Sequence, residues 1–555
     1  MENSKVANVR EGGSGSSIDE APINRHGTPD GYDSEMEGLT IYEKKALLVN
    51  RELAAQGMGR YQWMVFLLCG FGYFLDLLPP TGYRPLISNR WAQAFGLILP
   101  SIKQEFGFSA VDSGNLSTAF NAGLTAGALF WGVVTDIIGR YWAFNFTVLI
   151  ASIFGICLGA PDSYNGVLVL AAFVGIGVGG NVPIDTTICL ELLPRGKRWL
   201  LPTLSVFQPL GVIVCSAITY GFIPNYSCAT DLESCKNVPN GQACCSKQDN
   251  WGWRYTMFTI GSITIAAFIG RFFLFKFKES PKFLLFRGRD ADAVEVLQYI
   301  AKFNKVPCTI SIESFENLDG DDDPSPGVEG REGRIVLGSG ERQKDLSLFQ
   351  KFKFEMSRLK VLFSSPVMAW LTICVFLVYC FDYFAFSISG AFLPTILRNR
   401  GTELGLGLQW TYLSYIYIKL FGIPGVLAGT TIYKWRRLSM VVSSALFGGM
   451  LFAFTAVHDA NSYIGISGLV YCFQSMFNAI LYGMTPEFFP APVRGTACGA
   501  ASFFGRVFGI IAPLVGARVL AVSQNGVLYL AGSSAFVSTI FICLIPARFI
   551  GGQSY

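Results

Sequence analysis

The sequence predicts an all-α integral membrane protein with twelve transmembrane helices arranged as two six-helix bundles. Three observations predict this fold class: the composition, the spacing of the apolar residues and an internal repeat. Of the 555 residues, 51% are hydrophobic and only 15% are charged, and the mean hydropathy is +0.41. The apolar residues come in blocks of about 20, which is the length of helix that crosses a bilayer core. This pattern excludes an ordinary soluble domain, and a net charge of +4 gives no indication of nucleic-acid binding.

Twelve apolar blocks follow one another along the chain. Six lie in the first half, near 61–100, 114–135, 142–159, 164–193, 199–223 and 253–277. Six lie in the second half, near 366–397, 410–433, 438–457, 461–489, 496–520 and 525–549. We therefore expect a disordered cytoplasmic tail over 1–60, an N-terminal bundle over 61–277 and a cytoplasmic linker over 278–365. A C-terminal bundle over 366–549 and a short cytoplasmic tail over 550–555 follow.

The charge of the short loops predicts the orientation in the membrane. Cytoplasmic loops are rich in Lys and Arg. Basic residues follow the second, fourth, eighth and tenth blocks, as Arg140, then Arg195, Lys197 and Arg198, then Lys434, Arg436 and Arg437, and finally Arg494. The opposite loops hold fewer, with Arg398 and Arg400 as exceptions. Both ends of the chain and the linker are therefore expected in the cytoplasm.

The loop between the fifth and sixth blocks is expected outside. It contains the glycosylation sequon that begins at Asn225. Four cysteines cluster there and are candidates for disulfides, with their pairing left open: Cys228, Cys235, Cys244 and Cys245. Free thiols in a loose loop are the alternative.

The two halves of the chain repeat each other. Glu191, Pro194 and Arg198 end the fourth block, and the same three residue types end the tenth block at Glu487, Pro490 and Arg494, an offset of 296 residues. Arg140 and Arg436 are related by the same offset. Parallel six-helix repeats place a substrate site at their interface, near the midplane of the bilayer.

The first block departs from this repeat. Twelve residues separate Asp382 from Pro394 in the seventh block, whereas 24 separate Asp76 from Pro100 in the first. The excess lies at 79–90, where three prolines and two arginines would break a helix in lipid. We interpret this stretch as an insertion, such as a retained intron in the gene prediction; a genuine re-entrant loop is the alternative.

Several motifs identify a resemblance to the major facilitator superfamily. The segment from Gly132 to Arg140 resembles the loop motif between helices 2 and 3 of that family, and Glu487 to Gly495 resembles its helix 10–11 motif. The segment from Lys278 to Leu285, with Gly288-Arg289 after it, is similar to the one that follows helix 6 in sugar porters. Together with Trp253-Arg254-Tyr255 and the outer cysteines, these motifs look most like the synaptic-vesicle-glycoprotein-like branch, which includes many fungal transporters.

The resemblance implies transport, but not of hexoses in particular. The seventh block lacks the Gln-Gln pair of hexose porters and the tenth lacks their Trp, although Gln208 stands where a sugar-contacting Gln is expected. A sugar, an organic acid, phosphate and an amphipathic metabolite all remain open as substrates.

Charged residues within the predicted spans are candidates for coupling transport to protons. A charge at the bilayer centre costs about 2.5–3.5 kcal/mol on insertion scales, so it is rarely kept without a use. Burial favours the neutral form of a carboxyl group, which lets a proton load and leave as the group is exposed to either side. The candidates are Asp76, Asp185, Asp382 and Arg506. Structural ion pairs are the alternative.

Two further sets of residues are expected to serve gating and substrate contact. Charge pairs at cytoplasmic helix ends would hold that face closed, and they comprise Asp136, Arg140, Glu191, Arg198, Arg436, Glu487 and Arg494. Amides and tyrosines within spans would line the cavity, namely Asn121, Asn181, Gln208, Tyr379, Tyr383, Gln474 and Asn478. Hydrogen bonds between helices, or packing, are the alternative for this second set.

The remaining motifs exclude other chemistry. The glycines at 175, 177 and 180 imitate a dinucleotide-binding loop but lie in an apolar span, and glycine pairs such as Gly123 and Gly127 instead indicate close helix packing. Without a phosphate-binding loop, a metal-ligand cluster or a nucleophile elbow, we expect no ATP, metal, cofactor or enzymatic activity.

We therefore predict a secondary active transporter of a small polar solute that uses protons as its coupling ion. We expect it to be a glycosylated monomer of the plasma membrane rather than of the vacuolar membrane. Proton symport is the first choice of mode. Facilitated diffusion, proton-driven efflux of drugs or metabolites, a non-transporting sensor and a channel are the alternatives.

Overall fold

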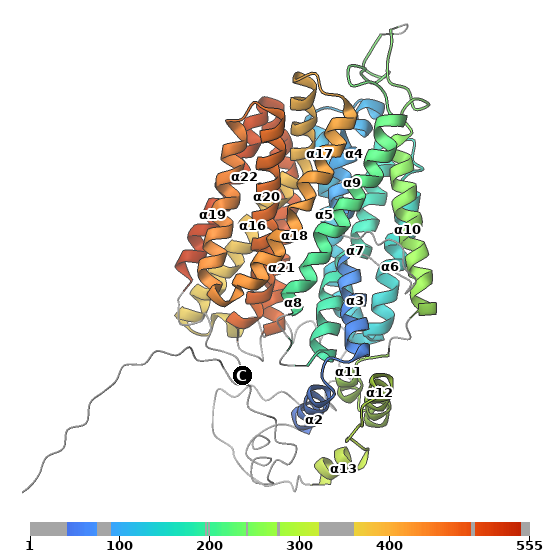
Figure 1. The fold of residues 1–555 in the computed structure, drawn as a ribbon, viewed down its shortest axis with the longest axis vertical. Coiled ribbons are helices and arrows are strands. Elements are labelled where there is room, and N and C mark those ends of the chain that lie inside the picture. The colour runs from blue at the N-terminus through green and yellow to red at the C-terminus, as the bar shows by residue number, and fades with distance from the viewer. Residues whose placement is uncertain are drawn as a thin grey trace, which may run out of the picture.

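The computed structural model describes residues 41–74, 90–194, 197, 200–239, 242–274, 278–320, 360–489 and 494–545. Regular structure within these ranges is helical, apart from an isolated bridge between Ser234 and Cys245. Figure 1 shows two helical bundles lying side by side, one from each half of the chain. Of the insertion predicted at 79–90, residues 79–89 lie outside the described residues. Its last residue, Arg90, begins α4.

The N-terminal bundle follows the apolar blocks of the first half of the sequence. The first block forms two helices that flank the undescribed stretch, and the fifth begins with short helical turns. The bounds are α3 Arg60–Phe74, α4 Arg90–Phe106, α5 Asn115–Ile138, α6 Arg140–Cys157, α7 Tyr164–Leu192, α8 Leu200–Thr203, η3 Leu204–Val206, α9 Phe207–Tyr226 and α10 Gly252–Leu274.

The C-terminal bundle contains the longest described helix, α16, with 38 residues. Ser365, Asp459 and Ser523 each cap the start of a helix by accepting a hydrogen bond from the backbone N–H three residues further on. The bounds are α16 Pro366–Glu403, α17 Leu408–Leu420, α18 Gly422–Thr431, α19 Arg436–Thr455, α20 Ala460–Phe488, α21 Arg494–Val522 and α22 Gln524–Leu544.

Eight helical stretches of the described chain are long and apolar enough to cross a bilayer, judged by length and composition. A shorter apolar stretch, Tyr164–Gly180, begins α7. Lipid offers no hydrogen-bond partners to the backbone, so spanning segments satisfy their N–H and C=O groups within the helix.

Glycines let α5 and α7 approach each other closely. A Cβ added at Gly123 would lie 1.9 Å from the carbonyl oxygen of Ala172, and one at Gly127 would lie 2.3 Å from that of Ile176. In the C-terminal bundle, a Cβ at Gly425 would lie 2.2 Å from the Cys472 carbonyl oxygen. The close helix packing predicted from these glycine pairs is therefore confirmed.

Four short helices lie at one end of the N-terminal bundle, opposite the end that carries the 227–251 loop (Figure 1). They are α2 Ile41–Gln56, α11 Pro281–Phe286, α12 Asp290–Asn304 and α13 Glu313–Gly320. The predicted cytoplasmic orientation of the linker assigns this end to the cytoplasm.

The prediction of disorder over 1–60 was wrong for the α2 segment, while residues 1–40 lie outside the described residues. Val49 and Leu53 of α2 are buried in one core with Phe315 of α13. Lys45 Nζ lies 2.5 Å from Asp290 Oδ2, at the start of α12. The polar composition concealed an apolar stripe at helical spacing, whose partners lie about 240 residues further along the chain.

Substituting Gly123 by Ala should lower the free energy of unfolding by about 1–3 kcal/mol or more, because the added methyl group meets backbone that cannot move aside. The matched control is Gly221→Ala in α9, where an added Cβ meets nothing within 4 Å. Thermal unfolding of the detergent-purified variants measures both. Equal shifts in Tm would contradict the packing described here.

Candidate functional site

The two bundles meet at a small cavity lined by aromatic and small polar side chains. The N-terminal bundle contributes Phe95, Ser117, Phe120 and Asn121, and the C-terminal bundle contributes Phe386, Ser387, Gly390 and Ala391. Phe95 lies on α4, the others of the first set on α5, and the second set on α16. The cavity therefore lies at the interface that the repeat predicts for a substrate site.

Asn121 bridges the two bundles at this cavity. Its Nδ2 donates to Ser387 Oγ at 3.2 Å and to the Gly509 carbonyl oxygen at 3.1 Å. Ser387 Oγ in turn donates to the Gly509 carbonyl oxygen at 3.0 Å. The sequence singled out Asn121, whereas it missed Ser117 and Ser387, because a serine in an apolar helix is common and carries little signal.

Arg506 also spans the interface. Its side chain is buried, its Nη1 donates to the Leu124 carbonyl oxygen on α5 at 2.9 Å, and its Nε lies 3.3 Å from Ser502 Oγ. The guanidinium thus ties α21 to α5. The ion pair that is the alternative to its role in proton coupling does not occur for Arg506 among the described residues.

Asp382 lies in the middle of α16, with 3% of its surface exposed. Tyr379 precedes it by three residues on the same helix, Tyr383 directly follows it, and the Tyr482 ring of α20 lies 6.2 Å from the Tyr379 ring. The Tyr379 hydroxyl lies 2.9 Å from Thr485 Oγ1, and the Tyr482 hydroxyl donates to that of Tyr383 at 3.1 Å. A cluster of hydroxyl groups therefore accompanies Asp382, while the part of the chain that the structure describes provides no ion pair for it.

Several other residues predicted for the site are also buried. Asp185 of α7 is fully buried and Asn478 of α20 is buried, whereas Gln208 of α9 is half-buried. Gln474 Nε2 lies 3.4 Å from Ser389 Oγ of α16. Lys419 of α17 is a further buried charge, and its Nζ lies 3.9 Å from the centre of the Tyr471 ring.

At the end of the bundle that the loop charges assign to the cytoplasm, two residues of the set predicted for the gate, Arg140 and Glu191, form an ion pair. Arg140 Nη2 lies 3.4 Å from Glu191 Oε1, and its guanidinium carbon lies 4.4 Å from the centre of the Phe283 ring. Both side chains are largely buried, so this pair is screened less by water than an exposed one.

Glu279 completes this cluster and was missed by the sequence analysis. Its carboxylate accepts hydrogen bonds from the backbone N–H groups of Arg140 and Tyr141, the first residues of α6, at 3.1 and 3.2 Å. Gly139, at φ +95°, leaves room for it, since an added Cβ would lie 2.3 Å from Glu279 Oε2. Burial raises the pKa of Glu279, while these hydrogen bonds and the Arg140 charge act to lower it. An acid at a helix N-terminus stabilises the partial positive charge there.

The remaining residues of the three predicted sets, for proton coupling, gating and substrate contact, lie outside what the structure describes, either entirely or in their side chains. Asp76 and Arg198 are outside the described residues, and nothing is described of five side chains, those of Asp136, Asn181, Arg436, Glu487 and Arg494.

At the opposite end, which carries the 227–251 loop and is predicted to face outward, the two bundles are in direct contact. The Tyr412 hydroxyl of α17 donates to the Leu97 carbonyl oxygen of α4 at 3.0 Å. A Cβ at Gly96 would lie 2.6 Å from the Gly390 carbonyl oxygen, and one at Gly114 would lie 2.3 Å from that of Pro513. The outer face of the interface is therefore closely packed.

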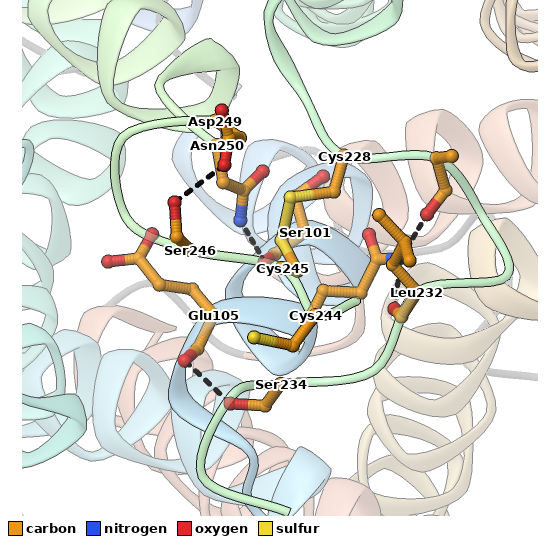
Figure 2. The surroundings of a disulfide bond; sticks show 12 residues. Ser101, Glu105, Cys228, Leu232, Ser234, Cys244, Cys245, Ser246, Asp249 and Asn250 are labelled. Atoms are coloured by element: carbon orange, nitrogen blue, oxygen red, sulfur yellow. Dashed lines mark hydrogen bonds between the residues drawn. A yellow bond between two sulfur atoms is a disulfide. The ribbon is translucent and has the colours of Figure 1, made fainter. Parts of the chain in front are cut away.

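The outer loop between α9 and α10 is held by two disulfides. Cys228 is bonded to Cys245 and Cys235 to Cys244, and Figure 2 shows the surroundings of one of these bonds. Asn225, in the last turn of α9, is exposed, and its Nδ2 donates to the Gly221 carbonyl oxygen at 3.0 Å.

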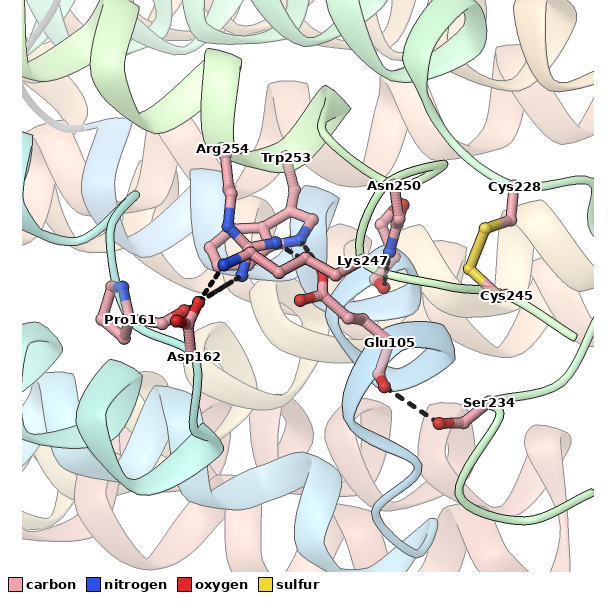
Figure 3. A network of polar contacts seen from close by, with 11 residues as sticks. Glu105, Pro161, Asp162, Cys228, Ser234, Cys245, Lys247, Asn250, Trp253 and Arg254 are labelled. Carbon is pink, nitrogen blue, oxygen red and sulfur yellow. Dashed lines mark hydrogen bonds and ion pairs between the residues drawn. A yellow bond between two sulfur atoms is a disulfide. The ribbon is translucent and has the colours of Figure 1, made fainter.

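A buried ion pair connects the start of α10, directly after this loop, to the end of α4 (Figure 3). Arg254 Nη1 and Trp253 Nε1 donate to Glu105 Oε2 at 2.6 and 2.8 Å. Arg254 Nη2 donates to the Pro161 carbonyl oxygen at 3.0 Å, between α6 and α7. The Arg254 and Glu105 side chains are 1% and 6% exposed, so each charge depends on the other for its burial.

Fold and site together define a multi-pass membrane protein with a small cavity between two helical bundles, and the comparisons agree. The Major Facilitator Superfamily model matches residues 88–513. "MFS siderochrome iron transporter 1" of Ceriporiopsis subvermispora is 36% identical over 512 residues, 91% of each chain. "Synaptic vesicle glycoprotein 2C" of Mus musculus is 26% identical over 273 residues, which cover 49% of this chain and 34% of that protein.

Among solved structures, the xylose transporter XylE from E. coli, in a partially occluded inward-open conformation, superposes with a TM-score of 0.59 at 14% identity, covering 88% of this chain and 98% of that chain. The chain belongs to the Major Facilitator Superfamily. The predicted family and fold class, twelve transmembrane helices in two bundles, are confirmed, and the chain is a membrane transporter rather than an enzyme.

Replacing Arg254 with Ala should lower the free energy of unfolding by about 3–5 kcal/mol, because it leaves the Glu105 charge buried without its partner. Lys247→Ala is the control. Lys247 pairs with Asp162 across exposed surface, with side chains 45% and 71% exposed, and such pairs contribute about 0–1 kcal/mol. Thermal unfolding of both variants in detergent provides the measurement, and a comparable loss in the two would show that burial does not set the strength of the Arg254 pair.

Proposed function

We propose that this protein is a proton-coupled secondary active transporter of a small polar solute that works by alternating access. The observation that carries the proposal is Asp382, a carboxyl group buried within α16 with no ion pair among the described residues. A permanent charge in such surroundings is costly, whereas a group that takes up and releases a proton carries the charge only while water reaches it.

The position of Asp382 supports its coupling to movement of the bundles. It lies on α16, the helix that also contributes Ser387 and Gly390 to the interface cavity. Rocking of one bundle against the other would expose this region to one side of the membrane at a time. The proton would then enter on one side and leave on the other, and would carry the solute with it. Asp76 and Asp185 remain candidates to share this role.

The cytoplasmic cluster of Arg140, Glu191 and Glu279 supports a gate on that side. Within the N-terminal bundle it joins the start of α6, the end of α7 and the segment before α11. We propose that the repeat-related residues of the C-terminal bundle (Arg436, Glu487 and Arg494) serve the same purpose, with Asp136 and Arg198 completing the first set.

The cavity supports a solute with both apolar and hydrogen-bonding groups. Phe95, Phe120 and Phe386 offer ring faces, and Ser117 and Asn121 offer polar groups. We propose that Asn181, Gln208, Tyr379, Tyr383, Gln474 and Asn478 add polar contacts as the cavity opens. A thermal-shift screen of the purified protein would identify the solute, with a sugar, a small organic acid such as nicotinate, phosphate and a ferric siderophore as probes, the last suggested by the name of the fungal relative.

The disulfide-bonded outer loop supports a place in the plasma membrane, because its outer face is oxidising. We propose that the protein works there as a monomer and that Asn225 is its glycosylation site. Counterflow of the identified solute in proteoliposomes separates this function from the alternatives, since a sensor gives no flux, a channel gives no trans-acceleration, and an efflux antiporter moves protons against the solute.

Asp382→Asn should abolish uptake driven by a pH gradient while solute counterflow continues, because the amide keeps the shape of the side chain but cannot carry a proton. We expect at least a tenfold loss of gradient-driven uptake, the equivalent of about 1.4 kcal/mol. Proteoliposomes loaded with unlabelled solute measure both activities. Asp231→Asn, at an exposed position of the outer loop, is the control and should leave both unchanged. Full pH-driven uptake by Asp382→Asn would contradict the proposed role.

A further inference from the structure

Gln104, near the outer end of α4, contacts the disulfide-bonded loop and the opposite bundle at the same time. Its Nε2 donates to the carbonyl oxygens of Ala229 and Leu232 in the loop, at 3.0 and 3.1 Å. Its Oε1 accepts a hydrogen bond from Arg398 Nη2 of α16 at 3.2 Å. A single amide group therefore connects the N-terminal bundle, its outer loop and the C-terminal bundle.

The orientation of this amide is fixed by its partners. Backbone carbonyl groups only accept hydrogen bonds, and a guanidinium group only donates them. If the amide were turned over, its NH2 group would face the Arg398 guanidinium and its oxygen would face two carbonyl groups. The two loop carbonyls therefore determine that the Gln104 oxygen points at Arg398.

The loop in turn is held firmly against α4 (Figure 2). Ser234 Oγ donates to the Glu105 carbonyl oxygen at 2.9 Å, and Asn250 Nδ2 donates to that of Ser101 at 2.7 Å. The Glu105 carbonyl group, in the last turn of α4, needs such a partner because no backbone N–H within the helix reaches it. The Cys228–Cys245 disulfide closes the segment that contains Ala229 and Leu232, so it limits where those two carbonyls can lie.

Arg398 explains one of the two exceptions to the distribution of basic residues. Its side chain is 7% exposed and reaches across to Gln104, close to the contact between Tyr412 and Leu97. Arg400 is different. It lies on the same helix but stays within its own bundle, where it donates to Asn525 Oδ1 at 2.9 Å and lies near the Tyr463 hydroxyl.

We propose that Gln104 and Arg398 form the outer gate of the transporter, and that the disulfide-bonded loop is the positioning element that holds Gln104 in place for Arg398. The gate opens when the guanidinium leaves the amide. The loop remains attached to α4 and presents the same acceptor when the bundles close again. This proposal rests on the alternating-access part of the proposed function, but needs neither a particular solute nor proton coupling.

Hydrogen–deuterium exchange of the full chain in nanodiscs tests the gate without solute or pH gradient. Arg398→Ala and Gln104→Ala should speed exchange about tenfold at the outer ends of α4 and α16, as expected for loss of one hydrogen bond to a charged group. Because the bundles rock, opening of the outer side should press the facing cytoplasmic ends of α8 and α20 together. Hydrogen–deuterium exchange at these ends should therefore slow. Arg400→Ala is the matched control and should leave the outer end of α4 unchanged.

The loop is tested by replacing Cys228 and Cys245 together with Ser. This change should speed exchange at the outer ends of α4 and α16 as Gln104→Ala does, and combining the two changes should add little, because both break the same arrangement. If the double Ser variant does not fold, treatment of the folded wild-type protein with a phosphine reductant replaces it.

Three results would overturn the proposal. Unchanged exchange in Arg398→Ala would show that this contact does not keep the outer side closed. Faster exchange at both ends of the bundles would indicate general destabilisation instead of gating. Unchanged exchange after loss of the disulfide, or full additivity with Gln104→Ala, would show that the loop does not position Gln104. None of these measurements involves Asp382 or a pH gradient. A negative result would therefore count against the gate alone, and would leave the proposal of proton coupling at Asp382 to its own test.

Discussion

The cost of placing charge inside a membrane governs the arrangement of this molecule. Lipid provides neither water nor hydrogen-bond partners, so every buried charge must find its partners in the protein or lose its charge. Arg506 meets a backbone carbonyl of the opposite bundle, and Arg254 meets Glu105. Asp382 has two tyrosines close to it on α16, Tyr379 and Tyr383, instead of an ion pair among the described residues. This difference separates the groups that hold the structure together from the one proposed to take up a proton.

The contacts between the bundles fall into two kinds with different consequences for movement. Close approaches of backbone, such as Gly96 to Gly390, depend on shape and are lost as soon as the bundles separate. Hydrogen bonds from Asn121 and Arg506 to carbonyl oxygens are directional, so they define one closed arrangement. An interface closed by both kinds of contact is well defined, yet each contact is small enough to break during a transport cycle.

The sequence predicted the fold class well, because the bilayer requires apolar blocks of fixed length and because the two halves carry matching Glu-Pro-Arg motifs. It also pointed to Asn121, Arg140 and Glu191, which stand out as polar residues in or beside apolar helices. It could not predict partners that only the folded chain brings together. Glu279 caps α6 from 139 residues away, α2 packs on helices about 240 residues further along, and Gln104 meets Arg398 across 294 residues. None of these pairings leaves a periodic pattern in the sequence.

The central claim is that movement of the solute and movement of a proton are one event. The most direct measurement is simultaneous recording of both fluxes in proteoliposomes of the wild-type protein, with a pH dye inside the vesicles and labelled solute outside. The account predicts that adding solute alone, without an imposed gradient, acidifies the vesicle interior in a fixed ratio to the solute taken up. Solute uptake with no change in internal pH would contradict it.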